Sequence, residues 1–438
     1  MRLAVARHWG FGMEMVEKGI AAGMIREADT AVVFHDLDML ERRLGEVTTA
    51  FGPAALAAAA IKANPLPPVL AFLAGLGAGA EAASLPEVRL ALDAGFTAGR
   101  IVFDSPAKTF EELRLAVSLG LNVNADNLDE VERLGTVGAS LGRAPRAGLR
   151  VNPQVGLGRI KATSVAGVYS KFGVPLADRE AILAAFARCP WLEGLHVHIG
   201  SQGCSLDMLV AGVGAIYDLA LEINARLGAR RVRRFDLGGG LPVAYRDTDD
   251  PPTPGVYAAA LAERCPGLFS GQFDLVTEFG RFLHAPCGLA VSRVEYVKRQ
   301  PGHNTAVLHL GADMFVRECY NPELWTHGVT LLSPDGREKG GERGTWHLAG
   351  PLCFSGDFPI RQARLPDVAP GDLVAIHDVG AYTLAMWSRY NSRQMPRILG
   401  YRQGRFNVLR EREEPEDLVR FWRGRPVAPG GGGQGREE

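Results

Sequence analysis

Eight short apolar segments, separated by amphipathic helical patterns, constrain the fold of this chain more than any other feature. The segments lie at residues 56–62, 79–83, 101–104, 122–125, 147–152, 194–199, 234–237 and 274–278. Helical patterns such as 85–94, 109–119, 178–186 and 206–226 lie between them. This alternation is typical of an α/β fold with a closed parallel (β/α)8 barrel, although periodicity alone does not separate a barrel from an open doubly wound sheet.

After about residue 286 the pattern changes to short alternating segments punctuated by glycine and proline. They cover residues 288–298, 305–310, 344–348, 373–376 and 397–401, and they predict a mostly antiparallel β domain. We therefore expect a barrel at residues 31–285 and a β domain at 286–410, which the segment 1–30 is expected to join. Residues 411–438 are interpreted as a charged, glycine-rich tail that is partly disordered.

The composition excludes several classes of partner. The chain has 438 residues, of which 47% are hydrophobic, and a formal net charge of −1. It can therefore bury a large core, and no nucleic-acid partner is expected. No stretch of 18 apolar residues and no apolar leader occurs, which predicts a cytoplasmic protein without a membrane partner. The six cysteines include no Cys-x-x-Cys pair, so neither a zinc site nor a disulfide framework is indicated.

Lys62 is the strongest single candidate for chemistry. It ends the first barrel segment in the motif Ile-Lys-Ala-Asn-Pro, and the chain has only seven lysines among its 48 basic residues. A lysine buried at the end of a strand changes its pKa readily, which is how lysines become Schiff-base nucleophiles. The alternative is a lysine that reaches solvent from a strand end, and Lys62 considered alone favours that alternative.

The seventh and eighth segments end in a candidate phosphate site. The seventh ends in Asp-Leu-Gly-Gly-Gly at 236–240, and the eighth ends in Glu-Phe-Gly-Arg at 278–281. Phosphate often binds after these two strands of a barrel, and glycines let backbone N–H groups converge on an anion. A glycine triplet alone is usually only a turn. The triplet followed one strand later by a carboxylate, a glycine and an arginine favours a phosphate site.

Two histidines, His196 and His198, occupy the sixth segment in the motif His-Val-His-Ile-Gly-Ser-Gln. Residues two apart on a strand point the same way, so a metal pair is one interpretation. No cluster of further ligands supports it, and no metal is predicted. His196 is interpreted as a core residue, whereas His198 suits a position beside a ring or a phosphate.

Together these motifs resemble the fold-type III pyridoxal-phosphate enzymes, and in particular the diaminopimelate and ornithine decarboxylases. The resemblance also rests on Gly-Ala-Glu at 79–81, Lys-Phe-Gly at 171–173, Gly-Pro-Leu-Cys-Phe-Ser-Gly-Asp at 350–357 and Asp-Val-Gly-Ala-Tyr at 378–382. It extends from about residue 30 to 402, in the order of the family. It implies the alanine-racemase-like architecture of a barrel followed by a β domain.

The resemblance implies a role for each matching residue. Lys62 would bind pyridoxal 5'-phosphate as a Schiff base, His198 would stack on its ring, and Glu278 would bond the ring nitrogen and keep it protonated. Arg150 matches the family's arginine near the phenolic oxygen, and Cys353 would arrive from the other subunit as the acid that protonates the product. The other implied cofactor contacts are Glu81, Ser201, Gly239, Gly240, Gly280, Arg281 and Tyr382.

The chain departs from the family where the substrate would bind. The diaminopimelate branch usually has an acidic residue after the cysteine, which would bind a distal ammonium, but this chain has Phe354. Arg317 is a candidate for the substrate carboxylate and Glu318 for a distal amine, although a solvated surface explains both equally well. Tyr320 and Asp357 complete the candidate substrate residues, and Asp357 is alternatively only a turn residue.

The leading hypothesis is a homodimeric pyridoxal-phosphate decarboxylase with composite active sites, acting on a basic or diamino carboxylic acid such as diaminopimelate. A decarboxylase of a larger amino-acid conjugate, in siderophore or antibiotic metabolism, is an alternative that Phe354 would suit. A racemase is disfavoured by Glu278, because racemases of this fold set an arginine against the ring nitrogen. A regulatory pseudoenzyme is disfavoured because Lys62 and Cys353 are both present.

Overall fold

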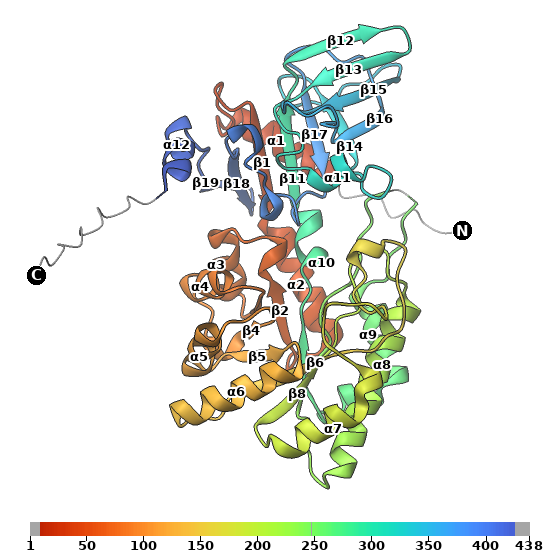
Figure 1. Cartoon of the computed structure of the whole chain (residues 1–438). Coiled ribbons are helices and arrows are strands. Elements are labelled where there is room, and N and C mark those ends of the chain that lie inside the picture. The colour runs from red at the N-terminus through yellow and green to blue at the C-terminus, as the bar shows by residue number, and fades with distance from the viewer. Residues whose placement is uncertain (1–8, 247, 425–438) are drawn as a thin grey trace, which may run out of the picture.

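The computed structural model describes residues 9–246 and 248–424, and its first domain is a closed barrel (Figure 1). The barrel strands are β2 (Leu56–Ala60), β3 (Gly79–Ala82), β4 (Ile101–Phe103), β5 (Asn122–Ala125), β6 (Arg146–Asn152), β8 (Leu192–His196), β9 (Arg234–Asp236) and β10 (Asp274–Thr277). All are parallel, and the ring closes because β10 pairs with β2 and β5 pairs with β6. The predicted (β/α)8 barrel is confirmed, and the open-sheet alternative is wrong.

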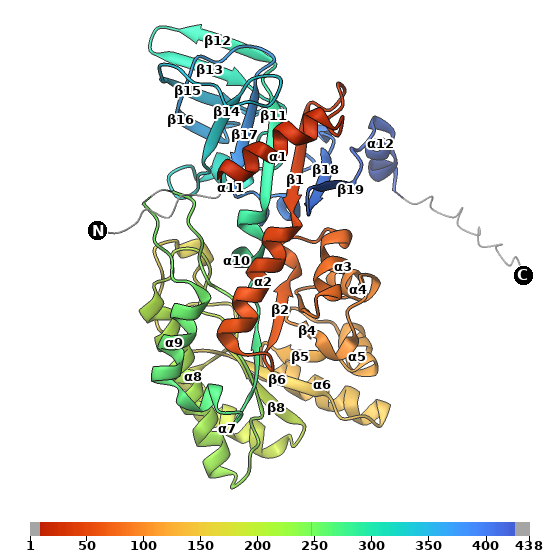
Figure 2. The same cartoon turned by 180° about the vertical axis from the view of Figure 1, so that it is seen from behind.

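Helices cover the outside of the barrel (Figure 2). They are α2 (Leu37–Phe51), α3 (Pro67–Gly75), α4 (Leu85–Asp93), α5 (Phe110–Leu119), α6 (Leu128–Leu141), α7 (Arg179–Arg188), α8 (Leu206–Arg226) and α9 (Pro254–Arg264). Local sequence explains their ends: α5 begins with a capping box between Thr109 and Glu112 and ends at the left-handed Gly120. Six barrel strands end one to three residues earlier than predicted, because the chain turns into the loops that carry polar side chains.

The second domain contains two sheets. The six-stranded sheet has the order β14 (Val329–Leu332), β17 (Leu373–His377), β11 (Gly288–Arg293), β1 (Ala31–Asp36), β18 (Arg397–Arg402) and β19 (Arg405–Arg410). The four-stranded sheet has the order β12 (Tyr296–Gln300), β13 (His303–Val307), β15 (Gly344–Ala349) and β16 (Ile360–Leu365). Among these strands only the β1–β18 and β13–β15 pairs are parallel, so the predicted mostly antiparallel domain is confirmed.

Strand β1 is the main difference from the prediction. The sequence places residue 31 at the start of the barrel, and this is wrong, because β1 pairs with β11 and β18 in the six-stranded sheet. A short apolar strand has the same pattern in either sheet, so only tertiary pairing decides its neighbours. The preceding helix α1 (Trp9–Ala21) packs on this sheet, since Val16 shares a core with Leu289 and Leu399.

The C-terminal part of the chain also differs from the prediction. Where a partly disordered tail is expected, Pro415–Arg423 form helix α12, which buries Leu418. The expected disorder of the last residues and the expected placement of residues 1–8 lie outside the described residues. No helix in the described ranges is both long and apolar enough to cross a membrane.

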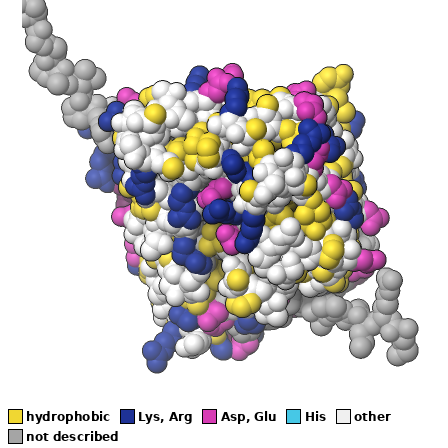
Figure 3. Space-filling view, turned by 90° about the horizontal axis from the view of Figure 1, so that it is seen from below, with side chains coloured by type: hydrophobic (Ala, Val, Ile, Leu, Met, Phe, Trp, Pro, Cys, Tyr) yellow, Lys and Arg dark blue, Asp and Glu magenta, His cyan; other side chains and the backbone are white. Residues whose placement is uncertain are grey.

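The β domain stands over one end of the barrel (Figures 1 and 2). Strand β10 leads through the short helix α10 (Arg281–His284) and the turn Ala285–Cys287 directly into β11, so the carboxyl ends of the barrel strands face the β domain. The opposite barrel end, seen from below, mixes basic and acidic side chains (Figure 3). Functional groups from both domains are therefore expected at the junction between them.

Candidate active site

The predicted barrel residues gather at the carboxyl ends of the strands. Lys62 lies in the short helix Ile61–Ala63 after β2, Glu81 lies in β3, and His198 and Glu278 follow β8 and β10. Parallel strands deliver such residues to one end of a barrel, whatever their separation in sequence. The structure thus joins residues that the sequence could only place at separate strand ends.

Lys62 is anchored by a buried acid. Its Nζ lies 2.5 Å from Oε2 of Glu81, which is fully buried, while the Lys62 side chain is 38% exposed. Burial lowers the pKa of the Lys62 ammonium, but the carboxylates of Glu81 and Glu278 outweigh burial and hold that pKa above its ordinary value. Lys108, by contrast, is fully buried and bound to Glu130 at 2.8 Å. Of these two lysines, only Lys62 is open to a carbonyl compound.

Arg281 is a buried cation whose hydrogen bonds go to hydroxyl groups. Its Nε donates to Oγ of Ser201 at 3.2 Å, and its Nη1 donates to the hydroxyl of Tyr245 at 2.8 Å. The guanidinium also lies 4.6 Å from the ring centre of Tyr382. A buried guanidinium bound to hydroxyls is suited to an anion. Tyr245 was missed by sequence reasoning because it stands in a loop without a motif.

The glycines of the predicted phosphate site are required by their geometry. Gly238 and Gly240 have φ angles of 65° and 109°, in the left-handed region that favours glycine. A β-carbon on Gly280 would lie 2.8 Å from the β-carbon of Ala63, beside Lys62. These glycines therefore keep the backbone close to the strand ends and leave space for a ligand.

His198 is held as a neutral ring. The backbone N–H of Gly239 donates to Nδ1 of His198 at 2.9 Å, so Nδ1 is an acceptor and carries no proton. Burial, together with the charges of Arg150 and Lys62, lowers the pKa of His198 well below its ordinary value. Arg150 is itself fixed by Asp104 and Asp126, at 3.6 and 3.9 Å from its Nη1.

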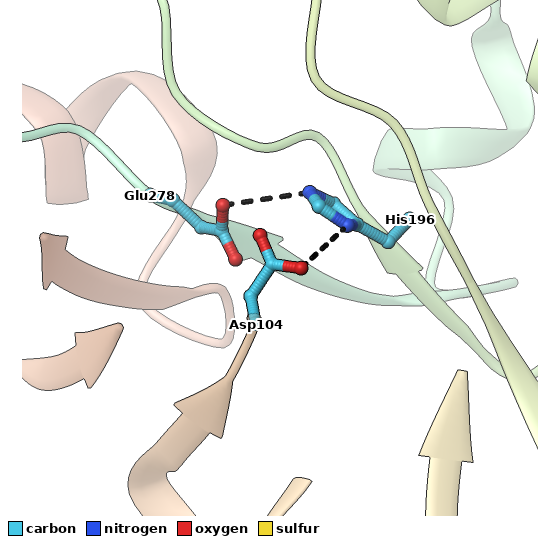
Figure 4. A group of neighbouring side chains, drawn as sticks. All are labelled: Asp104, His196 and Glu278. Carbon is cyan, nitrogen blue, oxygen red and sulfur yellow. Dashed lines mark ion pairs between the residues drawn. The ribbon is translucent and has the colours of Figure 1, made fainter. Parts of the chain in front are cut away.

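A buried cluster of Asp104, His196 and Glu278 lies beside these residues (Figure 4). Nδ1 of His196 lies 3.6 Å from Oδ1 of Asp104, and Nε2 lies 3.5 Å from Oε2 of Glu278. By ligand type the three could hold a metal, but the carboxylates face opposite nitrogens, which is the arrangement of a bridging imidazole. His196 is buried as predicted, yet it contacts charges rather than an apolar core. The position of Asp104 directly after a barrel strand was the signal that could have identified this cluster.

Glu278 combines burial with free acceptor atoms. Burial and the charges of Asp104 and Glu81 raise its pKa well above the ordinary value. Burial and the Glu278 charge raise the pKa of the neighbouring Asp236 to about 7. Among the described residues, neither carboxylate oxygen of Glu278 has a hydrogen-bond partner of good geometry. Such a group is suited to accept a hydrogen bond from a ligand.

Tyr382 and Arg317 reach the barrel from the β domain of the same chain. The backbone N–H of Tyr382 donates to the carbonyl of Ala63 at 2.8 Å, and its φ of 59° is strained for a bulky residue. The Arg317 guanidinium lies 5.7 Å from the Tyr382 ring centre and 4.3 Å from that of Trp325. Its Nη2 lies 3.5 Å from Oε1 of Glu318. Neither Nε nor Nη2 has a hydrogen-bond acceptor within the described ranges, so Arg317 has donors left for a carboxylate.

Two predicted substrate residues have structural partners instead. Glu318 is 1% exposed, and its Oε1 lies 3.1 Å from Nε2 of His327. The two oxygens of Asp357 accept the backbone N–H groups of Ala312 and Leu352, at 2.5 and 2.7 Å. These contacts argue against the predicted role of Glu318 toward a distal amine and favour the turn interpretation of Asp357.

Cys353 and Phe354 lie on a loop of the β domain. Cys353 is exposed, its N–H donates to Oδ1 of Asn391 at 2.8 Å, and its carbonyl accepts from the hydroxyl of Tyr390 at 3.1 Å. The other five cysteines are buried or half-buried. Phe354 stacks on Tyr320, with ring centres 4.8 Å apart and planes inclined by 15°. The exposed thiol and this aromatic pair thus form one surface of the β domain.

Comparison with known proteins agrees with this geometry. Residues 37–285 match the family model described as the pyridoxal-binding domain of pyridoxal-dependent decarboxylases. The chain is 33% identical over 390 residues to a diaminopimelate decarboxylase of Pseudomonas fluorescens, which covers 87% of this chain and 90% of the relative. It is 30% identical over 417 residues to that of Archaeoglobus fulgidus, which covers 93% of this chain and 96% of the relative. A crystal structure of diaminopimelate decarboxylase from Helicobacter pylori complexed with L-lysine aligns with a TM-score of 0.83 at 28% identity, over 92% of this chain and 99% of that one.

The residues fit pyridoxal phosphate. An accessible amine, a buried arginine bound to hydroxyl groups and a buried carboxylate with free acceptor atoms lie at neighbouring strand ends. When bound, this cofactor supplies a ring that accepts the electron pair left behind by CO2. The chain therefore belongs to the pyridoxal-dependent decarboxylase family, and it is a pyridoxal-phosphate-dependent decarboxylase of the diaminopimelate decarboxylase type.

Proposed function

We propose that this decarboxylase acts on a basic or diamino carboxylic acid, with diaminopimelate as the first candidate, as a cytoplasmic homodimer. The relatives named above are diaminopimelate decarboxylases, and the aligned crystal structure contains L-lysine. The observation that carries the proposal is Arg317, a half-buried guanidinium beside the Tyr382 ring whose Nε has no hydrogen-bond acceptor among the described residues. It is placed to bind the carboxylate of an amino acid that enters between the domains.

Lys62 is proposed to hold the cofactor covalently. Its amine must lose a proton before it attacks a carbonyl carbon, and Glu81, at 2.5 Å, is the carboxylate nearest to take that proton. Burial raises the pKa of Glu81, which makes it a stronger base. Ser201, Arg281 and the glycines at 239, 240 and 280 are proposed to bind the phosphate, with Tyr382 closing the site.

Glu278 is proposed to hold a proton on the ring nitrogen of the cofactor. Its buried carboxylate has acceptor atoms free for that contact among the described residues, and a preorganised charge of this kind is usually a large part of catalysis. His198 is proposed to support the face of the ring. Arg150 is proposed to bind the phenolic oxygen, because Asp104 and Asp126 fix its guanidinium.

Cys353 is proposed to return a proton to Cα of the product from the partner subunit. Within one chain its loop contacts Tyr390 and Asn391, and its thiol is exposed. In the described ranges no hydrogen bond or ion pair joins it to Lys62. These observations support two composite sites in a symmetric dimer, each with residues from both chains.

A substrate screen tests the proposed reaction. The purified protein is supplied with pyridoxal phosphate, and CO2 release is measured with diaminopimelate, lysine, ornithine, arginine and larger conjugates of these amino acids. We expect release from diaminopimelate, and we expect borohydride to fix the cofactor on Lys62 and not on Lys108, which is buried and paired. A label on Lys108, or no release from any basic amino acid, would contradict the proposal.

Mixing two inactive variants tests the composite sites. Lys62→Ala and Cys353→Ala are combined under conditions that allow subunit exchange, which differently tagged chains verify. Half of the dimers are then mixed and each has one complete site, so about a quarter of wild-type activity is expected. An absence of recovery after verified exchange would place both residues in one chain or remove Cys353 from the reaction.

A larger amino-acid conjugate is the second candidate substrate, because neither of the two positions considered for a distal ammonium offers a free carboxylate in the described structure. Phe354 stacks on Tyr320, and Glu318 is paired with His327. If the substrate is a conjugate, Phe354→Glu will lower the KM for diaminopimelate, and the matched control Phe354→Leu will not. If wild-type protein already has the lower KM for diaminopimelate, the conjugate is excluded.

A further inference from the structure

His196 lies at the centre of the buried cluster, and the proposed function gives it no role. Its Nδ1 lies 3.6 Å from Oδ1 of Asp104 and its Nε2 lies 3.5 Å from Oε2 of Glu278, so a carboxylate stands at ion-pair distance from each nitrogen (Figure 4). Neither contact has the geometry of a hydrogen bond in the described structure. The three side chains are at most 4% exposed. Water therefore has little access to these side chains and does little to solvate their charges.

The number of protons limits what this arrangement can be. A neutral imidazole has one N–H, so it can donate to only one of the two carboxylates, whereas an imidazolium donates to both. Three states satisfy both contacts. In the first, His196 is an imidazolium between two carboxylates; in the second, Glu278 carries the proton and donates it to Nε2; in the third, Asp104 carries the proton and donates it to Nδ1. All three states hold the same number of protons, and they differ only in where one proton lies.

The first and third states leave Glu278 ionised. The third is disfavoured because, although burial raises the pKa of Asp104, neighbouring cations, including Arg150, outweigh the effect of burial and hold that pKa below its ordinary value. Burial and the charges of Asp104 and Glu81 raise the pKa of Glu278, and Lys62 opposes them. Lys62 is the residue proposed to bind the cofactor, so its full ammonium charge is not available during the reaction. A second cation next to Glu278 is then needed, and His196, whose Nε2 lies 3.5 Å from Oε2 of Glu278, is the side chain placed to supply it.

We propose that His196 is a positioning residue that acts through Glu278: as an imidazolium fixed by Asp104, it keeps the Glu278 carboxylate ionised and directed toward the ring nitrogen. This inference rests on the role proposed for Glu278. The surrounding charged and titratable groups come from the neighbouring strand ends and are Lys62, Glu81, Asp104, Arg150, His198, Asp236 and Glu278.

Infrared spectroscopy of the holoenzyme with isotope-labelled glutamate tests the proposal without using turnover. Wild-type protein should show no protonated-carboxyl band from Glu278 near neutral pH. His196→Gln should show such a band, and the band should vanish when Glu278→Gln is added. The matched control is His284→Gln, which removes a buried histidine that contacts no member of the cluster in the described structure; it should leave the Glu278 signal unchanged.

Two further measurements complete the test. Nitrogen NMR of labelled histidine should find both nitrogens of His196 protonated in the wild-type holoenzyme. In His196→Gln, kcat should fall roughly 10-fold or more while KM changes little, a smaller loss than the roughly 10²–10³-fold expected when a preorganised partner is removed outright.

The wild-type spectra alone can overturn the proposal, even if His196→Gln fails to fold. A protonated Glu278, or a His196 with only one protonated nitrogen, would place the proton on one of the two acids. An unchanged Glu278 signal in folded His196→Gln would also refute it. If the wild-type protein releases no CO2 from any candidate amino acid, the proposed substrate fails, whereas these spectra still report on His196.

Discussion

The junction between the two domains should make this protein sensitive to acid. His35 in β1 and His284 in α10 lie on the two sides of the junction, with ring centres 6.1 Å apart. Both are buried, and within the described structure both nitrogens of His284 and Nε2 of His35 lack hydrogen-bond partners. Burial lowers the pKa of His35 from 6.5 to about 4. Burial and the neighbouring His35 lower that of His284 from 6.5 to about 3.

The sign of the effect follows from these values. The folded pKa of each histidine lies below its unfolded value, so the unfolded chain binds protons first as the pH falls. The stability contributed by neutral histidines is complete above about pH 6.5 and is lost as the pH falls toward the folded pKa values. At about pH 5 the free energy of unfolding should have fallen by roughly 2 kcal/mol for each histidine and roughly 4 kcal/mol for the pair.

Urea unfolding, followed by tryptophan fluorescence at about pH 8 and about pH 5, measures this loss. The variant His284→Leu replaces the ring with an apolar side chain that cannot take up a proton. Buried acids with raised pKa values, such as Glu278 and Asp236, change stability in the opposite direction, so wild type and variant must be compared with each other. The variant should lose roughly 2 kcal/mol less than wild type between the two pH values.

The exposed Val256, which takes up no proton, provides the control. Val256→Leu should lose as much stability as wild type over the same pH range. If His284→Leu also loses as much as wild type, the buried histidines do not govern acid sensitivity and the reasoning is refuted.

Three further predictions concern the site. Glu278→Gln should keep the cofactor and lose roughly 10²–10³-fold in kcat, because a neutral amide cannot hold a proton on the ring nitrogen; turnover near wild type would exclude this role. Gly280→Ala should weaken cofactor binding in an absorbance titration, since its β-carbon would lie 2.8 Å from that of Ala63, and an unchanged affinity would show that the pocket can relax. Arg317→Gln should raise the KM for every substrate roughly 10- to 100-fold, the usual worth of a hydrogen bond to a charged group, with little effect on cofactor affinity; an unchanged KM would remove Arg317 from the substrate site.

Local patterns predicted the architecture well. The spacing of apolar residues along the chain identified every barrel strand, because the repeat of a strand or a helix depends only on residues that are close in sequence. Strand ends then pointed to Lys62 and Glu278, since parallel strands bring such positions to one end of a barrel. Four strands of the β domain were not predicted there, namely β1, β14, β16 and β19. Short strands give few residues in which an alternation of apolar and polar side chains can be recognised.

Contacts between distant residues were decided only by the folded chain. Glu318 and Asp357 belong to two motifs that fit a substrate site. In the folded chain, however, His327 contacts the carboxylate of Glu318, and two backbone N–H groups donate to that of Asp357. His196 looked like a core residue, yet the closed barrel places Asp104 and Glu278 at its two nitrogens. Periodicity records which face of an element is apolar, whereas the partner of a buried charge depends on which other elements fold against it. The sequence therefore indicated candidate charged residues at the strand ends, though not Asp104, and the tertiary structure decided which of those charges are paired and which keep donors or acceptors free for a ligand.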